Sequence, residues 1–224
     1  MTLPTFNGTT QPGAVVELTI AGKSYLATVE DDGNWRVQLS EALAEGKQNY
    51  TVTAVDLAGN TTTVNGLITV DTSAPTPFTA KLDSASDSGA ANDDNLTKVT
   101  KPLISGTGEP GSHVKVDIAG AQYTTDVDQS GNWSVTVGTA LSAGEYSFSA
   151  TATDAAGNTT APVTGSFEVD IQTAVTGRLS ASSDTGNDNS DGLTKETKPT
   201  FNGTAEIGAV VTLAIGGNTY AAQV

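Results

Sequence analysis

Residues 83–95, which read DSASDSGAANDDN, hold four aspartates and two asparagines and neither lysine nor arginine. Carboxylate, amide and backbone carbonyl oxygens are the ligands of Ca²⁺, which takes about six to eight of them in a tolerant geometry. Without a cation, carboxylates gathered in one short loop raise one another's proton affinity and repel each other. The same residue types also build ordinary turns. The stretch therefore indicates either a cation-binding loop or a turn-rich, well-hydrated loop.

Few other residues offer chemistry. The chain has no cysteine, which excludes disulfides and thiolate metal sites, and its one histidine, His113, is too little for a zinc centre or a hydrolytic triad. Residues 126–132, DVDQSGN, resemble the start of an EF-hand loop, but Val137 stands where the bidentate glutamate belongs. A tight hairpin turn is the better interpretation. No nucleophile and base recur together, so we predict that the chain is not an enzyme.

The charge balance restricts the partners. Ten basic and 25 acidic residues give a formal charge of −15 and a pI near 4.1. This charge repels phosphate backbones and anionic lipid surfaces, so we expect no nucleic-acid and no membrane partner. No apolar run approaches the roughly 20 residues that cross a bilayer. Met1, the only methionine, is interpreted as a start residue placed before a fragment.

The elements that position the aspartates belong to an internal repeat. TLPTFNGTTQPGAVVELTIAG (2–22) returns as TKPLISGTGEPGSHVKVDIAG (100–120) and as TKPTFNGTAEIGAVVTLAIGG (197–217), so the period is 98 and then 97 residues. Self-similarity at such a period is typical of tandem modules. We divide the chain into residues 1–73, a unit that lacks its first strand, 74–172, a complete unit, and 173–224, the first half of a third unit.

Within a unit, apolar residues alternate with polar ones. HVKVDIA (113–119), NWSVTV (132–137) and EYSFSATATD (145–154) each place their apolar side chains on one face, and Gly, Asn and Asp separate the runs. Such alternation indicates half-buried antiparallel strands. About seven strands in a unit of about 98 residues predict an all-β fold of tandem immunoglobulin-like sandwiches. In the complete unit we expect the strands at 76–83, 101–107, 112–119, 122–128, 132–138, 145–153 and 162–170.

This strand order places the acidic loops at the ends of each sandwich. The loop 83–95 joins the first two strands and lies at the end where the last strand leaves for the next unit. The loops 108–112, 129–132 and 154–158 lie at the opposite end. Acidic groups are therefore expected where neighbouring units meet.

The motifs VDTSAP (70–75), LDSASDSG (82–89), GTGEPGSHVKV (106–116), SGNWSV (130–135) and ATDAAGN (152–158) resemble the bacterial immunoglobulin-like repeats of giant surface adhesins and biofilm-associated proteins. The resemblance covers the whole chain. It implies type I secretion, an extracellular place on the bacterial surface, and calcium bound near the junctions of a stiff rod.

The resemblance also implies a set of calcium ligands. They are the hinge aspartates Asp71 and Asp170, the acidic loop with Asp83, Asp87, Asp93 and Asp94, and Asp154 between the last two strands, which matches Asp56 in the first unit. In the third unit Asp184, Asp188 and Asp191 take this part. That unit departs from the pattern, because Ser180 and Ser190 stand where the second unit has Asp83 and Asp93.

The function that we expect is a calcium-stiffened spacer that supports cell adhesion or biofilm formation, with neighbouring repeats as its partners. The alternative is a module that itself binds a glycan or host-protein ligand. That alternative requires Tyr25, Tyr123 or Tyr220 to group on one exposed face. We also expect the first unit to expose a sheet edge, and the middle unit to be the most stable.

Overall fold

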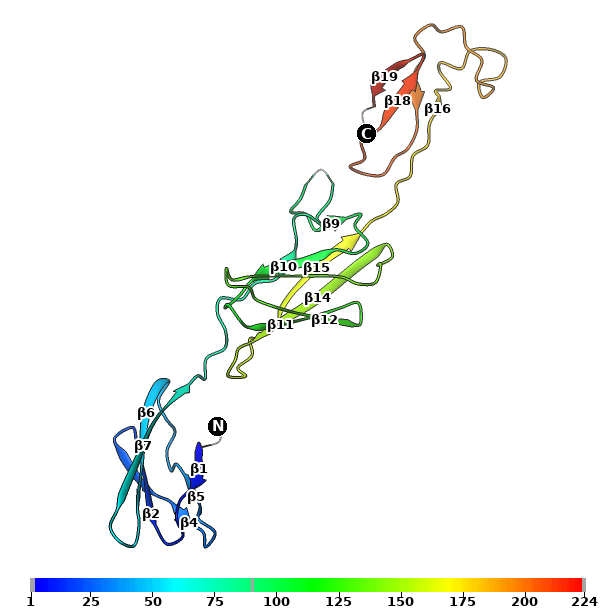
Figure 1. Ribbon diagram of the computed structural model, residues 1–224. Coiled ribbons are helices and arrows are strands. Elements are labelled where there is room, and N and C mark those ends of the chain that lie inside the picture. Colours follow the sequence, from blue (N-terminus) through cyan, green and yellow to red (C-terminus); the bar gives the residue numbers. More distant parts are fainter. Residues whose placement is uncertain (1–2, 90, 223–224) are drawn as a thin grey trace.

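The protein forms a row of three β-structured units in a computed structural model that describes residues 3–89 and 91–222 (Figure 1). The described residues contain strands, turns and bends, and no helix. They accordingly include no helix long and apolar enough to cross a bilayer. We refer to the predicted divisions 1–73, 74–172 and 173–224 as the first, second and third units.

The second unit is a sandwich of two sheets. One sheet has the strand order β13-β10-β8 and the other the order β12-β11-β14-β15-β9. Its strands are β8 (Lys81–Leu82), β9 (Leu96–Thr97), β10 (Leu103–Thr107), β11 (His113–Ile118), β12 (Ala121–Asp126), β13 (Asn132–Thr136), β14 (Gly144–Thr153) and β15 (Val163–Val169). All pairs are antiparallel except β15 with β9, which is parallel. The prediction of an immunoglobulin-like sandwich is confirmed.

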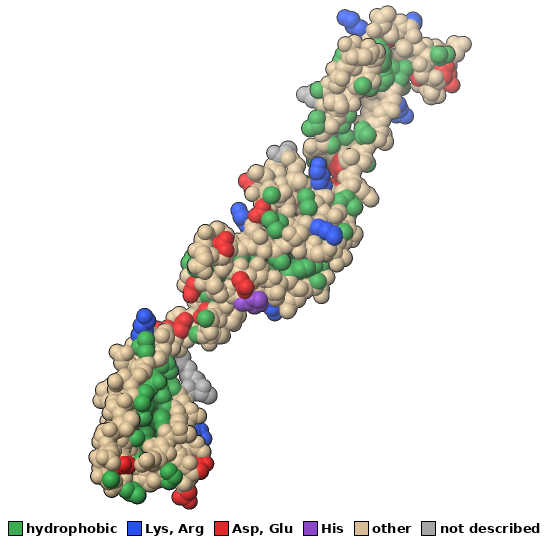
Figure 2. Space-filling view, in the orientation of Figure 1, with side chains coloured by type: hydrophobic (Ala, Val, Ile, Leu, Met, Phe, Trp, Pro, Cys, Tyr) green, Lys and Arg blue, Asp and Glu red, His purple; other side chains and the backbone are tan. Residues whose placement is uncertain are grey.

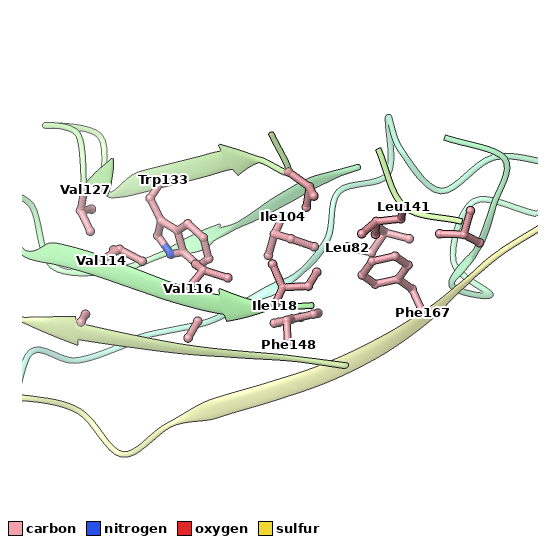
Figure 3. Packing of buried hydrophobic residues seen from close by; sticks show 14 residues of the cluster. Leu82, Ile104, Val114, Val116, Ile118, Val127, Trp133, Leu141, Phe148 and Phe167 are labelled. Carbon is pink, nitrogen blue, oxygen red and sulfur yellow. The ribbon is translucent and has the colours of Figure 1, made fainter. Parts of the chain in front are cut away.

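The core of the second unit lies between these sheets, as the alternating pattern predicts (Figure 3). Val114, Val116 and Ile118 of β11 and Phe148 of β14 are all buried in this core. Trp133 of β13 is buried too, which confirms its interpretation as a core residue. The strands differ from the prediction mainly at the start of the unit, where residues 76–83 form only the two-residue strand β8 and where β9 was not expected.

The first unit repeats the sandwich with fewer strands. Its sheets have the orders β1-β5-β4 and β3-β2-β6-β7. The strands are β1 (Thr5–Thr9), β2 (Val15–Ile20), β3 (Lys23–Leu26), β4 (Thr28–Val29), β5 (Asn34–Gln38), β6 (Gly46–Val55) and β7 (Thr61–Val70). Its buried core is smaller and consists of Val16, Leu18, Ile20, Trp35, Val37 and Leu39. In this unit β1 and β7 are edge strands.

The described part of the third unit contains two separate strand pairs, β16 with β17, which are far apart in the sequence, and the hairpin of β18 with β19. The strands are β16 (Arg178–Leu179), β17 (Phe201–Asn202), β18 (Thr212–Ile215) and β19 (Asn218–Ala221). Ile215 of β18 is 44% exposed, whereas Ile118, at the equivalent position of the second unit, is 3% exposed. Among the described residues of the third unit, no further strand covers this side chain.

Candidate functional site

The hinge between the first and second units brings together residues that lie far apart in the sequence. Asp71 directly follows β7, and Asn158 lies in the loop between β14 and β15. The Asn158 amide nitrogen donates to the Asp71 backbone carbonyl at 3.1 Å and to Asp71 Oδ1 at 3.4 Å. It also donates to Asp154 Oδ2 at 2.9 Å. Three oxygens of two aspartates therefore surround one donor group, and we call this cluster the hinge site.

The loop of Asp154 is a compact turn. Asp154 Oδ1 accepts the backbone amides of Ala156 and Asn158 at 2.9 and 2.8 Å. Its hydrogen bond with the Asn158 side chain, opposed by partial desolvation, holds the pKa of Asp154 below its ordinary value. Asp154 is therefore ionised at neutral pH and faces Asp71 across the hinge.

The first unit contains the same turn without a hinge partner among the described residues. Asp56 Oδ1 accepts the amides of Ala58 and Asn60, and the Asn60 side chain donates to Asp56 Oδ2 at 2.8 Å. The hydrogen bond from Asn60 lowers the pKa of Asp56 in the same way. The turn is thus a property of the repeat, and within the described residues the copy in the second unit is the one that contacts a hinge aspartate.

Glu45 of the first unit hydrogen-bonds Thr72, the residue that follows Asp71 in the hinge. Its carboxylate accepts hydrogen bonds from the backbone amide and the hydroxyl of Thr72, the latter at 2.6 Å. The hydroxyl contact is the main reason that the pKa of Glu45 lies below its ordinary value. The sequence prediction missed both Glu45 and Asn158. Asn158 recurs as Asn60 in the repeat, which was the available signal for it, whereas nothing in the sequence marked Glu45.

The acidic loop of the second unit lies at the far end of the sandwich, next to the exit of β15 (Figure 1). Asp87 is buried, with 7% of its surface exposed, and its Oδ2 accepts the Asn95 amide at 3.1 Å. Its Oδ1 is buried and has no hydrogen-bond partner among the described residues. A buried carboxylate oxygen without a donor is costly unless a cation or water satisfies it.

The third unit builds the same arrangement around Asp184. This side chain is 6% exposed, accepts the Gly192 amide at 3.1 Å through Oδ2, and also has a buried Oδ1 without a partner. The loop closes in both units through matching hydroxyl contacts, from Thr97 to the Ser86 carbonyl and from Thr194 to the Ser183 carbonyl. The unsatisfied oxygen is therefore a repeated feature of this loop.

The other predicted ligands are dispersed. Asp83 accepts the Ser105 hydroxyl at 2.6 Å, which lowers the pKa of Asp83. Asp93, Asp94, Asp188 and Asp191 are exposed, and the last three cap turns of their own loops. Asp170 accepts the Gln172 amide at 3.0 Å. Within residues 3–89 and 91–222, no three or more His, Cys, Asp or Glu side chains converge as a metal-binding group.

The tyrosines do not form the exposed cluster that a ligand-binding module would need. Tyr25 and Tyr123 pack against the cores of their own units, and Tyr220 alone is about half exposed, in β19. They occupy equivalent strands in three successive units. Nothing in the described part of the chain therefore favours the glycan or host-protein alternative.

The chain belongs to the bacterial Ig-like domain family, whose family model matches residues 1–72, 74–171 and 171–224. Membership of this family points to a structural or binding role. It also indicates a place outside or on the surface of a bacterial cell. A comparison with curated proteins finds no match.

Many solved structures are similar to the chain, and three of them are bacterial adhesins or a large adhesion protein. One is described as "Structural insight into host cell surface retention of a 1.5-MDa bacterial ice-binding adhesin", with 23% identity, 99% of this chain and 76% of that chain covered, and a TM-score of 0.42. Another is "Ca2+-stabilized adhesin helps an Antarctic bacterium reach out and bind ice", with 31% identity, 97% and 57% covered, and a TM-score of 0.40. The third is a "tetra-tandem repeat in extending region of large adhesion protein", with 22% identity, 98% and 58% covered, and a TM-score of 0.39. This chain therefore spans a little over half of the second and third structures.

Proposed function

We propose that the chain is a spacer of tandem immunoglobulin-like units from a bacterial surface adhesin, stiffened by Ca²⁺ at the hinge between units. Its partners are the neighbouring units of the same chain, while other parts of the adhesin contact a host-cell or biofilm surface. Export by type I secretion belongs to the same proposal. The support comes from the repeat, the acidic composition and the family membership.

The observation that carries the proposal is the convergence of Asp71 and Asp154 on the Asn158 amide. Their carbonyl and carboxylate oxygens already face a positively polarised group. Rotation of the Asn158 amide by a half turn would present its oxygen to the same space, since both ends of an amide occupy similar volumes. Asp71, Asp154 and Asn158 would then offer the mixed carboxylate, amide and carbonyl oxygens that Ca²⁺ prefers.

Asp87 and Asp184 support a second calcium position, which would lie in the acidic loop of the second unit and in the equivalent loop of the third unit. Each has one carboxylate oxygen held by a backbone amide and one buried without a partner. The ligands expected beside them are backbone carbonyls, hydroxyls and water, because the neighbouring carboxylates point elsewhere. We propose that Asp71, Asp154, Asp87 and Asp184 are the main ligands, with Asp83, Asp93, Asp94, Asp170, Asp188 and Asp191 contributing negative charge nearby.

The stiffening follows from thermodynamic linkage. A ligand that binds only the folded, aligned state stabilises that state by about 2.7 kcal/mol when the free ligand is in hundredfold excess over its dissociation constant. This is a large fraction of the stability of a domain of this size. In cytosol, where calcium is scarce, the hinge residues would leave the units free to move, which favours export. In millimolar calcium outside the cell, the same residues would fix the angle between units.

Calorimetry, thermal melting and small-angle X-ray scattering in calcium and in chelator test this proposal. Calcium should raise the melting temperature by on the order of 10 °C and narrow the distribution of angles between the first two units. Asp154→Asn should abolish the narrowing of the angle distribution by calcium. Asp56→Asn is the matched control, because it removes the carboxylate of the equivalent turn, which has no hinge partner among the described residues. In this control, calcium should still narrow the distribution. Identical melting and scattering curves in calcium and chelator would reject the proposal.

A further inference from the structure

One peptide group of the hinge, that between Asp71 and Thr72, is held from both sides. Its carbonyl oxygen, which belongs to Asp71, accepts the Asn158 amide nitrogen at 3.1 Å. Its N–H, which belongs to Thr72, donates to the two carboxylate oxygens of Glu45 at 3.2 and 3.1 Å. Asn158 is part of the second unit, whereas Glu45 directly precedes β6 of the first unit. A single peptide group is therefore hydrogen-bonded to both units.

The rigidity of the peptide group couples these two contacts. The N–H and C=O of a trans peptide lie in one plane and point in opposite directions, so neither bond can turn without the other. When Glu45 fixes the direction of the Thr72 N–H, it also fixes the direction of the Asp71 carbonyl. The Thr72 hydroxyl donates to Glu45 as well, at 2.6 Å. Hydrogen bonds to an ionised carboxylate are stronger than those between neutral groups, which favours a persistent contact.

Glu45 also lies near the Asp71 side chain. The hydroxyl and then the amide of Thr72 are the main causes that lower the pKa of Glu45, and the Asp71 side chain contributes to the same effect. Acidic side chains are visible at the junction between the first and second units (Figure 2). The Glu45 contact therefore acts directly beside the hinge site, on the residue that provides two of its oxygens.

The second hinge, between the second and third units, has an equivalent backbone. Asp170 follows β15 as Asp71 follows β7, and the Oδ1 atom of each accepts the amide two residues further on, at 3.0 and 3.1 Å. Gly46 pairs with the last residue of β7, and Gly144 pairs with the last residue of β15. The residues on either side of these pairs can therefore be compared directly.

The second hinge differs from the first in the side chains of this contact. Ala143 stands in the place of Glu45, and Ile171 stands in the place of Thr72. Alanine provides no side-chain acceptor and isoleucine no hydroxyl donor. The contact is therefore specific to the first hinge, although both hinges start from the same turn.

We propose that Glu45 is a positioning residue of the hinge site, which holds the Asp71 carbonyl toward the second unit before calcium binds. This inference rests on the proposed function of the hinge and adds a residue that does not itself contact the ion. Ligands that are already held in place lose less freedom on binding, so their affinity for the ion is higher. The peptide after Asp170, without such a contact, should be held less firmly.

Hydrogen exchange of single amides, measured by NMR on the full chain in chelator, tests the contact without calcium. The protection factor of the Thr72 amide should exceed that of the Ile171 amide by roughly tenfold. Glu45→Ala should remove this excess. Glu41→Ala is the matched control, because it removes the same charge from an exposed position of the same loop, and it should leave the excess unchanged. Equal protection of the two amides in the wild type, or full protection of Thr72 in Glu45→Ala, would overturn the proposal.

The contact should also be transferable to the second hinge. Ala143→Glu combined with Ile171→Thr supplies the acceptor and the hydroxyl at the equivalent positions. The amide at position 171 should then gain protection in chelator, whereas Ile171→Thr alone should not produce this gain. A double variant that exchanges at position 171 as fast as the single variant would contradict the proposed geometry.

Calorimetric titration with calcium tests the positioning role. The binding that Asp154→Asn removes is assigned to the hinge site. Glu45→Ala and Thr72→Val should each weaken this binding, by up to roughly tenfold. Thr72→Val changes no charge, so its effect cannot come from weaker attraction of the ion. Thr72→Ser keeps the hydroxyl and should bind as the wild type does.

The double variant distinguishes one shared contact from two separate effects. Because Glu45 and Thr72 act through the same contact, Glu45→Ala with Thr72→Val should bind calcium no more weakly than Glu45→Ala alone. Additive losses, or equal affinities of all variants and the wild type, would overturn the role of Glu45 and leave calcium binding at the hinge intact. A wild type without calcium binding at the hinge would overturn both this role and the proposed function.

Discussion

Asn158 hydrogen-bonds Asp71 although 87 residues separate them, and it does so while holding Asp154. This contact links the end of one sandwich to the loop of the next. It combines a hinge aspartate, which the repeat places after every last strand, with a turn that the repeat places at every opposite end. The contact between units therefore arises from two features that each unit carries on its own.

Asp87→Asn should change stability in opposite directions with and without calcium. In chelator, the amide avoids burying a charged oxygen that has no partner, so the second unit should be stabilised by about 1 kcal/mol or more. In calcium, the same change removes a proposed ligand, and the stabilisation by the ion should decrease. Urea unfolding in both media measures this reversal. Asp94→Asn, at an exposed turn in the same loop, is the control, and a change of the same sign in both media would count against Asp87 as a ligand.

Asp83 should contribute to the acid sensitivity of the second unit. Its pKa is lowered chiefly by the Ser105 hydroxyl, so the folded state favours the ionised carboxylate. This stabilisation is present above the unfolded-state pKa near 3.9 and is lost as pH falls through the lower folded-state value. Asp83→Asn should therefore flatten the stability curve of the second unit between about pH 4 and pH 2. Unfolding midpoints across this range test it, and an Asp83→Asn curve as steep as that of the wild type would refute it.

Gly165 should not tolerate a side chain, although its backbone conformation would allow one. A Cβ there would overlap the Phe148 ring, as one at Gly66 would overlap Tyr50 in the first unit. Gly165→Ala should destabilise the second unit by about 1 to 3 kcal/mol through overpacking. Gly138→Ala, where the nearest atom of Tyr123 would be 3.5 Å away, should be close to neutral. Equal unfolding free energies for the two variants would disprove this difference.

Hydrogen exchange should be slowest in the second unit, intermediate in the first and fastest in the third. The second unit has the largest buried cluster, the first has six buried core residues, and the third leaves Ile215 44% exposed at the position of the buried Ile118. Amides in well-packed strands exchange only through large openings, whereas those in thinly covered hairpins exchange through local ones. Mass spectrometry of exchanged peptides can follow all three units at once. Uniform protection along the chain would be inconsistent with this order.

The sequence by itself determined the repeat, the positions of the strands after residue 100 in the second unit and the inward face of those strands, because alternation and glycine turns are local signals. It did not determine the start of that unit, where residues 76–83 form only β8 and where β9 was not expected. Trp133 and Val116, for example, are buried as their alternation predicts. The sequence also indicated aspartates at both ends of each sandwich, but it did not distinguish the aspartates that are buried or contact another unit from those that lie in solvent.

Only the tertiary structure decided which of these aspartates meet. It buried one oxygen of Asp87, left Asp93 in solvent and joined Asp71 to Asn158 across the hinge. Composition states how many carboxylates a loop contains, but their directions depend on backbone hydrogen bonds and on contacts between residues nearly a whole unit apart.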